Sequence, residues 1–125
     1  MNVFEKVVAY GNPIVTKSFA FAVRIVKFYK LYIGKDRSLE PLYKQLLRCG
    51  TSIGANVSEA QSAFTKKDFI HKMSISLKET RETEYWLKLL KETDSINEKE
   101  FNSLIKDCEE ILKLLTSIIK SSKSK

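Results

Sequence analysis

The 125-residue chain has little of the material from which turns are made. It holds four Gly and two Pro, and a chain poor in both has few breaks between its elements. A chain of this length is also expected to build one domain around one core. These absences indicate a few long helices rather than many short strands.

Cysteine and long apolar runs are also scarce. Cys49 and Cys108 lie far apart without CxxC spacing, which argues against a disulfide framework or a zinc site and predicts two buried free thiols. The longest apolar run, Phe19 to Val23, is too short to cross a bilayer, and the N-terminus has no cleavable signal pattern. We therefore expect no contact with a membrane, and a reducing, cytoplasmic location.

Signatures of catalysis and cofactor binding are missing as well. The sequence has no Gly-rich phosphate loop, GxSxG elbow, HExxH motif or Cys/His nucleophile pair. Its single His, His71, cannot supply the paired Glu-x-x-His motifs of di-iron bundles. We expect no enzyme activity, no cofactor and no metal centre.

Positive charge is what the chain has in excess. The formal net charge is +7, and such a balance favours anionic partners such as nucleic acid, acidic protein surfaces or anionic lipid. Residues 1–62 hold nine Lys or Arg against four acids, and residues 63–125 hold thirteen against eleven. The excess therefore lies toward the N-terminal half.

Apolar residues recur at three- and four-residue steps in four stretches, which predicts four amphipathic helices. The first runs over Val15–Ile33, after Asn12 as a cap and Pro13. The second follows Ser38 as a candidate cap and keeps helical spacing through Phe64. The third follows Thr65 as cap, with Asp68 three residues on. The fourth follows Ser95 or Asn97 and ends near Ile119.

These helices predict an all-α, antiparallel up-down four-helix bundle in a single domain, 1–125. Residues 1–14 form an N-terminal segment with a possible short helix over Val3–Tyr10, and residues 120–125 form a basic tail expected to fray.

The first two helices have unusual surfaces. The first carries more apolar residues than one buried face requires, which suggests either central burial or contact with another subunit. The second passes through small residues around Gly50 and Gly54. Because helical Gly costs about 1 kcal/mol relative to Ala, we expect a neighbouring helix to approach closely there.

Two groups of basic residues are candidates for phosphate contacts. Lys66, Lys67 and Lys72 lie with His71 at the start of the third helix, where the helix dipole also favours anions. Lys17, Arg24 and Lys27 fall within one arc of the first helix. Either group could instead be an ordinary solvated surface.

The carboxylates of the middle helices have a structural and a catalytic interpretation. Glu59 lies beside apolar positions of the second helix, three residues after Asn56. A general base would need a second acid, nucleophile or metal, and the segment supplies none. We therefore favour bonds from Asn56 and Glu59 to backbone or to basic groups of a neighbouring helix. Glu82 is expected to pair with Arg48 or another base.

One segment resembles a known family. The pattern R-x(3)-S-I-x(2)-N-x(2)-E is matched by Arg48, Ser52, Ile53, Asn56 and Glu59, a later acidic pair by Glu82 and Glu84, and a helix start by Lys67, Phe69 and Ile70. The chain therefore resembles the bacterial four-helix-bundle family named for proteins encoded in 23S rRNA intervening sequences. It departs from the pattern at Ala60, where the family usually has Gly, and at Lys78 and Glu79, where the family has small residues.

The resemblance implies a homopentameric barrel of four-helix bundles without established biochemical activity. It also implies similarity to the accessory proteins of diversity-generating retroelements, which bind a reverse transcriptase and nucleic acid. On this basis Asn56 and Glu59 of the second helix would fix the geometry where helices pack closely. The surplus aromatic residues of the first helix would lie in the contacts between subunits.

Together these observations favour a non-enzymatic homo-oligomer that binds structured RNA or DNA through phosphates. The alternative is a scaffold that receives a partner protein such as a polymerase, without touching nucleic acid itself.

Overall fold

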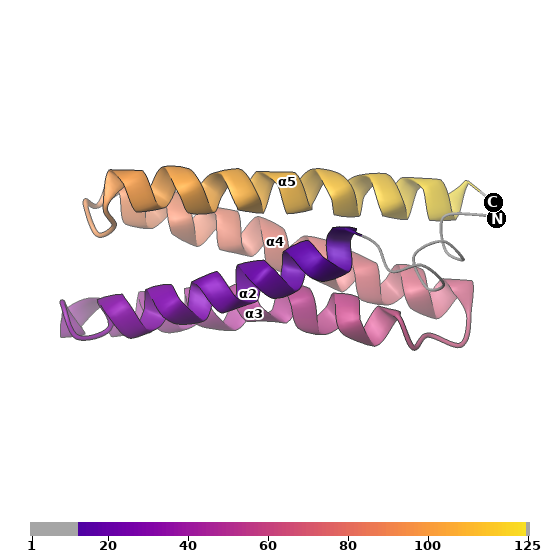
Figure 1. The fold of residues 1–125 in the computed structure, drawn as a ribbon, viewed down its shortest axis with the longest axis horizontal. Helices are drawn as coiled ribbons and strands as arrows, with labels where there is room; N and C mark the ends of the chain where they lie inside the picture. Colours follow the sequence, from indigo (N-terminus) through magenta and orange to yellow (C-terminus); the bar gives the residue numbers. More distant parts are fainter. Residues whose placement is uncertain (1–12, 125) are drawn as a thin grey trace.

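The computed structural model describes residues 13–124, and all its long elements are helices. They are α2 (Pro13–Tyr32), the short 3₁₀ helix η1 (Arg37–Leu39), α3 (Glu40–Ala60), α4 (Lys66–Glu92) and α5 (Glu98–Lys123). Each long helix runs antiparallel to the next and packs against it, and α5 returns to α2 (Figure 1). The predicted four-helix bundle is confirmed. The predicted helix at Val3–Tyr10 and cap at Asn12 lie outside the described residues.

Side-chain caps set the helix starts. Thr65 accepts a bond from the backbone N–H of Asp68 at 3.0 Å, as predicted. Asn97, one of the two candidates, caps α5 by accepting from the N–H groups of Lys99 and Glu100. The prediction for Ser38 is wrong. Asp36 accepts from its N–H at 3.0 Å, so Ser38 falls inside η1 and α3 begins without a side-chain cap.

Two helix ends differ from the sequence prediction. α3 ends at Ala60, and Phe64 lies in the turn beyond it with 99% of its surface exposed. Its helical spacing from Ala60 is therefore a coincidence. α5 runs to Lys123, with Ser122 buried. The helix therefore includes Lys120 to Lys123, which the sequence analysis placed in the basic tail.

The core is one continuous apolar cluster along the bundle axis. Every long helix contributes a stripe of buried residues at helical spacing, and the largest fully buried side chains are Phe21, Phe69, Ile14, Ile25, Leu46, Ile53, Met73, Leu87, Leu90, Leu104, Ile111 and Leu115. Cys49 and Cys108 are buried free thiols, as predicted. Burial raises the pKa of Cys49 to about 11 and that of Cys108 to about 12.

The small residues of α3 mark a close approach to α2. A Cβ on Gly54 would lie 3.0 Å from the backbone oxygen of Ser18, and a Cβ on Gly50 would lie 2.9 Å from the Ile25 side chain. Both distances are shorter than ordinary carbon contacts. The predicted close approach is confirmed, and the missing side chains of α3 allow it.

Candidate functional site

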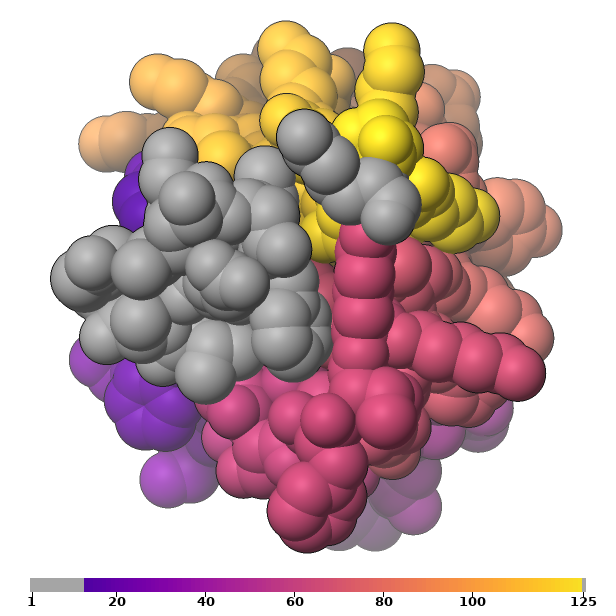
Figure 2. Space-filling model, turned by 90° about the vertical axis from the view of Figure 1, so that its right-hand side faces the viewer, coloured from indigo at the N-terminus to yellow at the C-terminus, as the bar shows by residue number. Residues whose placement is uncertain are grey.

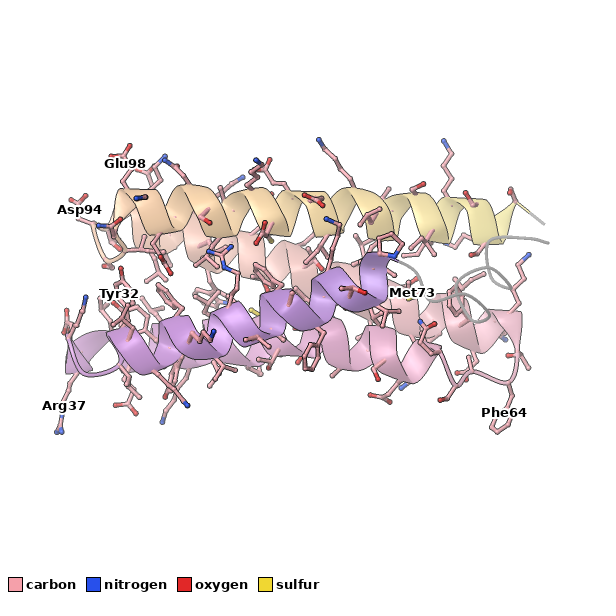
Figure 3. The ribbon with its side chains drawn as sticks, in the orientation of Figure 1. Tyr32, Arg37, Phe64, Met73, Asp94 and Glu98 are labelled. Carbon is pink, nitrogen blue, oxygen red and sulfur yellow. The ribbon has the colours of Figure 1, made fainter. Side chains whose placement is uncertain are left out.

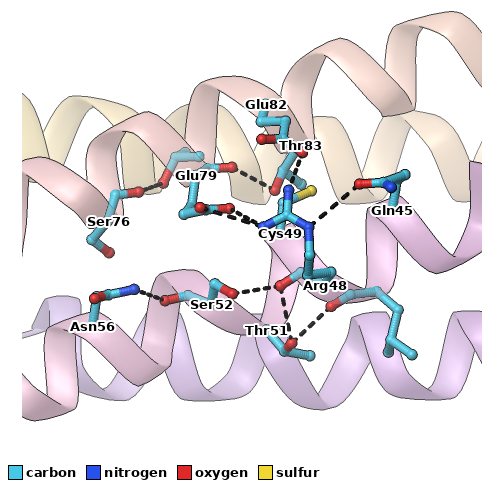
Figure 4. Close-up of polar contacts among 12 residues, drawn as sticks. Gln45, Arg48, Cys49, Thr51, Ser52, Asn56, Ser76, Glu79, Glu82 and Thr83 are labelled. Atoms are coloured by element: carbon cyan, nitrogen blue, oxygen red, sulfur yellow. Dashed lines mark hydrogen bonds and ion pairs between the residues drawn. The ribbon is translucent and has the colours of Figure 1, made fainter.

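A polar cluster joins the motif of α3 to the acidic residues of α4. The Arg48 guanidinium bonds to Glu79, with 3.2 Å between Nη1 and Oε2, and to Glu82 through Nη2 (Figure 4). Its Nε also donates to Gln45 at 3.3 Å. The expected pairing of Glu82 is therefore with Arg48, and Glu79, where the family pattern has a small residue, joins the same cluster.

Glu82 lies at the centre of this cluster. It accepts a second bond from Trp86 Nε1 at 3.2 Å. Partial burial raises the pKa of the Glu82 carboxyl, but the bonds from Trp86 and Arg48 outweigh it and hold that pKa below the usual range. The bond that Arg48 donates to Glu82 raises the pKa of Arg48 in turn. The contacts of Arg48 with Glu79 and Glu82 therefore tie α3 to α4.

The other motif residues serve the backbone of α3 and its neighbours. Ser52 donates to the Arg48 oxygen at 2.6 Å, and Asn56 donates to the Ser52 oxygen at 2.8 Å. The backbone oxygen of Ile53 accepts from Ser76 of α4 at 2.6 Å, in a buried position. These bonds support the structural interpretation of Asn56, which bonds its own helix rather than a neighbour.

Glu59 is paired across helices. Its Oε1 lies 3.0 Å from Lys72 Nζ of α4, and 59% of its side chain is exposed. Glu84 lies half-buried, 3.9 Å from Lys88 of the same helix. A general base needs a positioned partner acid or nucleophile, and the recorded partner of Glu59 is a lysine. The arrangement suits a structural ion pair.

The six nominated phosphate contacts divide into two sets. Lys72 pairs with Glu59, Lys17 with Glu110, and Arg24 with Asp107 at 2.5 Å. Lys27, Lys66 and Lys67 have no ion pair within residues 13–124. Sequence reasoning missed the pairing because it depends on which helices are neighbours, and α5 supplies two of the three acids.

Those pairs form a seam along α2 and α5. Arg24 also donates to the Ser103 hydroxyl at 2.9 Å, and the Lys17 bond lowers the pKa of Glu110. A cavity of about 200 Å³ lies between the two pairs, against Phe21 and Ile111. Charged pairs rather than a dense apolar contact therefore close the bundle on this side.

The surplus apolar residues of α2 lie on its outer surface. Phe21, Ile25, Phe28 and Tyr32 are buried, whereas Phe19 is 71% exposed and Val23 and Val26 are each 37% exposed. The three exposed residues, at steps of four and three, form one stripe. We call Phe19, Val23 and Val26 the outer stripe. The bundle core does not account for it.

A hollow lies at the end of the bundle where two loops meet. Its volume is about 470 Å³, and its walls come from the α2–α3 and α4–α5 connections. Tyr43 donates to the Ser95 oxygen at 3.0 Å, and the Tyr32 hydroxyl accepts from the Asn97 N–H at 3.2 Å. The hydroxyl groups of Tyr32 and Tyr43 thus hold the α4–α5 turn in place. The periodicity of the sequence did not predict these two hydrogen bonds.

No metal-binding group stands out in the part of the chain that the structure describes: residues 13–124 contain no cluster of three or more His, Cys, Asp or Glu able to hold an ion. Over the same residues, no helix is both long and apolar enough to cross a bilayer.

Comparison with known proteins identifies the family. The sequence model described as "23S rRNA-intervening sequence protein" matches residues 12–117. The chain belongs to this family. The motif from Arg48 to Glu59 that carried the resemblance lies inside the matched region, so the recognition from those residues is confirmed. No curated protein matches the chain.

A solved structure agrees with this membership in the 23S rRNA-intervening sequence protein family. The chain is similar to a crystal structure of a protein of unknown function from the S23 ribosomal protein family of Bacteroides thetaiotaomicron, with 50% sequence identity and a TM-score of 0.81. The match covers 86% of this chain and 98% of that one. The relative supports the fold, and its described function is unknown.

Proposed function

We propose that the chain is a non-enzymatic, cytoplasmic, homo-oligomeric bundle that binds structured RNA or DNA through phosphate contacts. The observation that carries the proposal is the surplus of free positive charge. The net charge is +7, and Lys27, Lys66 and Lys67 have no ion pair among the described residues. Phosphate contacts of this kind give affinity without sequence preference.

The oligomer is proposed from the outer stripe. Phe19, Val23 and Val26 lie exposed on one line of α2, and an exposed apolar line on a helix is a common subunit contact. Five subunits in a ring is the arrangement that the family resemblance implies. A ring repeats each weak basic patch, so several patches can engage one nucleic acid and raise its overall affinity.

Salt-dependent binding tests this function. A fluorescently labelled structured RNA is titrated with the protein at about 50, 100 and 200 mM salt, and fluorescence anisotropy gives the apparent dissociation constant. Six or more phosphate contacts would weaken binding by about a thousandfold over this range. Binding to a duplex DNA of equal charge should also weaken steeply with salt, because phosphate contacts contribute in both complexes. Absence of binding at 50 mM would refute the proposal.

The second candidate is a protein-interaction scaffold, which the outer stripe favours because it is apolar rather than charged. A partner protein held there, such as a polymerase, would stay bound at high salt and would be lost when Phe19 is replaced by Ser. A partner that stays bound at about 200 mM salt, on a protein that binds no nucleic acid at about 50 mM salt, would favour the scaffold over the nucleic-acid function.

A further inference from the structure

The two ends of the bundle differ in charge. Residues 59–72 and 111–124, around the α3–α4 turn and the end of α5, hold six Lys against two acids. Residues 30–44 and 88–100, at the other end, hold seven Lys or Arg against six acids. Each set contains 28 residues, so the contrast is not one of size. We call the first set the basic end of the bundle.

The two halves of the basic end lie side by side. The Cys108 thiol contacts the Thr80 backbone oxygen at 3.5 Å, and Lys91 Nζ lies 4.8 Å from the centre of the Phe101 ring. Because α4 and α5 are antiparallel with equal rise per residue, this register puts Lys67 level with the last turn of α5. Figures 1 and 2 show the α3–α4 turn and the end of α5 at the same end of the molecule.

The charges of this end are available to a partner. Lys67, Lys113, Lys120 and Lys123 are exposed, and Lys66 is partly exposed; within residues 13–124 none of the five has an ion pair. The sequence has no acid after Glu110, and Lys17 already neutralises Glu110. The outward face of α5 exposes no large apolar side chain. The sequence analysis placed Lys120 and Lys123 in a frayed tail and did not propose them as phosphate contacts, although the absence of acids after Glu110 was already visible.

An aromatic ring stands beside these lysines. Phe64 is 99% exposed, in the turn directly before Lys66 and Lys67, and projects away from the bundle (Figure 3). A fully exposed ring next to free cations is the combination with which proteins bind single-stranded nucleic acid, because any base can stack on the ring while lysines hold the phosphates. Insertion into a membrane would call for a broad apolar face, and Phe64 is the only exposed large apolar residue of this end among residues 13–124.

We infer that the basic end binds an unpaired segment of nucleic acid, such as the loop of a folded RNA. The strand crosses the end of the bundle, its phosphates contact the lysines of α4 and α5, and one base stacks on Phe64. This inference rests on the proposed function and deepens it, since it names the part of the nucleic acid that is recognised and the surface that recognises it.

The test compares binding by one set of variants to two probes. A labelled 20-nucleotide single strand and a duplex of equal total charge are titrated by anisotropy at about 100 mM salt. The Lys120→Gln, Lys123→Gln double variant should weaken single-strand binding about tenfold or more. Its matched control is Lys99→Gln with Lys106→Gln, which removes the same charge from exposed positions at the other end of α5 and should change binding less than threefold. Phe64→Ala should weaken single-strand binding about tenfold and duplex binding little.

Three results would overturn the inference in different ways. Equal losses in the Lys99, Lys106 and Lys120, Lys123 variants would mean that net charge, not this end, decides binding. Unchanged affinity in Phe64→Ala would remove the base-stacking contact. If the variants of the basic end lose binding to phosphatidylserine vesicles but not to nucleic acid, the end is a lipid contact. Each of these three results leaves the proposed function intact, provided that the wild-type protein binds nucleic acid. If the wild-type protein binds neither the single strand nor the duplex, both the proposed function and this inference are refuted.

Discussion

At the residue scale, the family motif acts as a set of fixed contacts between helices. Arg48 reaches two carboxylates of α4, and Glu59 reaches Lys72 of the same helix. Ser52 and Asn56 satisfy backbone oxygens of α3. Each of these side chains is held in a bond within the bundle. The ion pairs of Arg48 and Glu59 therefore fix the axial position of α4 relative to α3.

Replacing Glu82 by Gln tests this ionic contact through pH. Because the bonds to Glu82 lower its pKa in the folded state, the pair stabilises the fold above the unfolded pKa of about 4.3, and this stabilisation is lost as the pH falls through the lower, folded value. The pair is partly exposed, so the loss is about 1 kcal/mol or less. Urea unfolding at pH 7 and pH 3 should show a smaller pH effect in Glu82→Gln than in wild type.

The control for that measurement is Glu109→Gln, since Glu109 is exposed and has no ion pair in the part of the chain that the structure describes. It should keep the wild-type difference between pH 7 and pH 3. Equal pH effects in wild type and Glu82→Gln would contradict the proposed role of Glu82.

Asp94 offers a second test at this scale. It has φ of 53°, and the turn it forms carries a bond from the Ser95 N–H to the Leu90 oxygen at 2.8 Å. This left-handed position after a helix is one that Gly adopts without strain. Asp94→Gly should raise the free energy of unfolding by about 1 kcal/mol. Asp94→Ala keeps a Cβ and should give no such gain; a gain of equal size in both variants would contradict the explanation.

At the element scale, the bundle is held unevenly. α3 packs closely against α2 because Gly50 and Gly54 have no side chains there. α3 contacts α4 through ion pairs and through the buried hydroxyl of Ser76. α2 contacts α5 through two surface ion pairs beside a small cavity. The α2–α5 contact is therefore the most sensitive to salt. This leaves α2 anchored chiefly by α3.

Gly54→Ala tests the contact between α2 and α3. The added methyl would lie 3.0 Å from the Ser18 oxygen, which is backbone and cannot rotate away. We expect a loss of about 1–3 kcal/mol in unfolding free energy, despite the helical preference for Ala. Ser58→Ala, on the exposed side of α3, should change stability by about 0.5 kcal/mol or less. A stabilised Gly54→Ala protein would show that α2 does not need the space.

The elements were the part that sequence reasoning predicted best, because a stripe of apolar residues at helical spacing has one physical meaning. It failed at Phe64, where the spacing continued past the end of α3, and at Ser38, which lies inside η1 because Asp36 caps that short helix. The pairing of Lys17 and Arg24 with α5 depended on helix neighbours that a single sequence does not record. Contacts within one helix were thus predictable and contacts between helices mostly were not.

At the scale of the whole molecule, three surfaces are distinct. The outer stripe of α2 is apolar, the end formed by the α3–α4 turn and the last turns of α5 is basic, and the opposite end is nearly balanced in charge. A ring assembled through the outer stripe would present one basic end per subunit. The proposed function requires such an assembly for high affinity.

The most direct test of this account is the protein's mass by light scattering, with and without a structured RNA, at about 50 and 200 mM salt. We predict a mass several times that of one chain at both salt concentrations, an added RNA mass at 50 mM, and loss of the RNA at 200 mM. The Phe19→Ser, Val23→Ser variant should have the mass of a single chain. A wild-type protein that is a monomer and binds no RNA at about 50 mM salt would contradict the claim of a nucleic-acid-binding homo-oligomer.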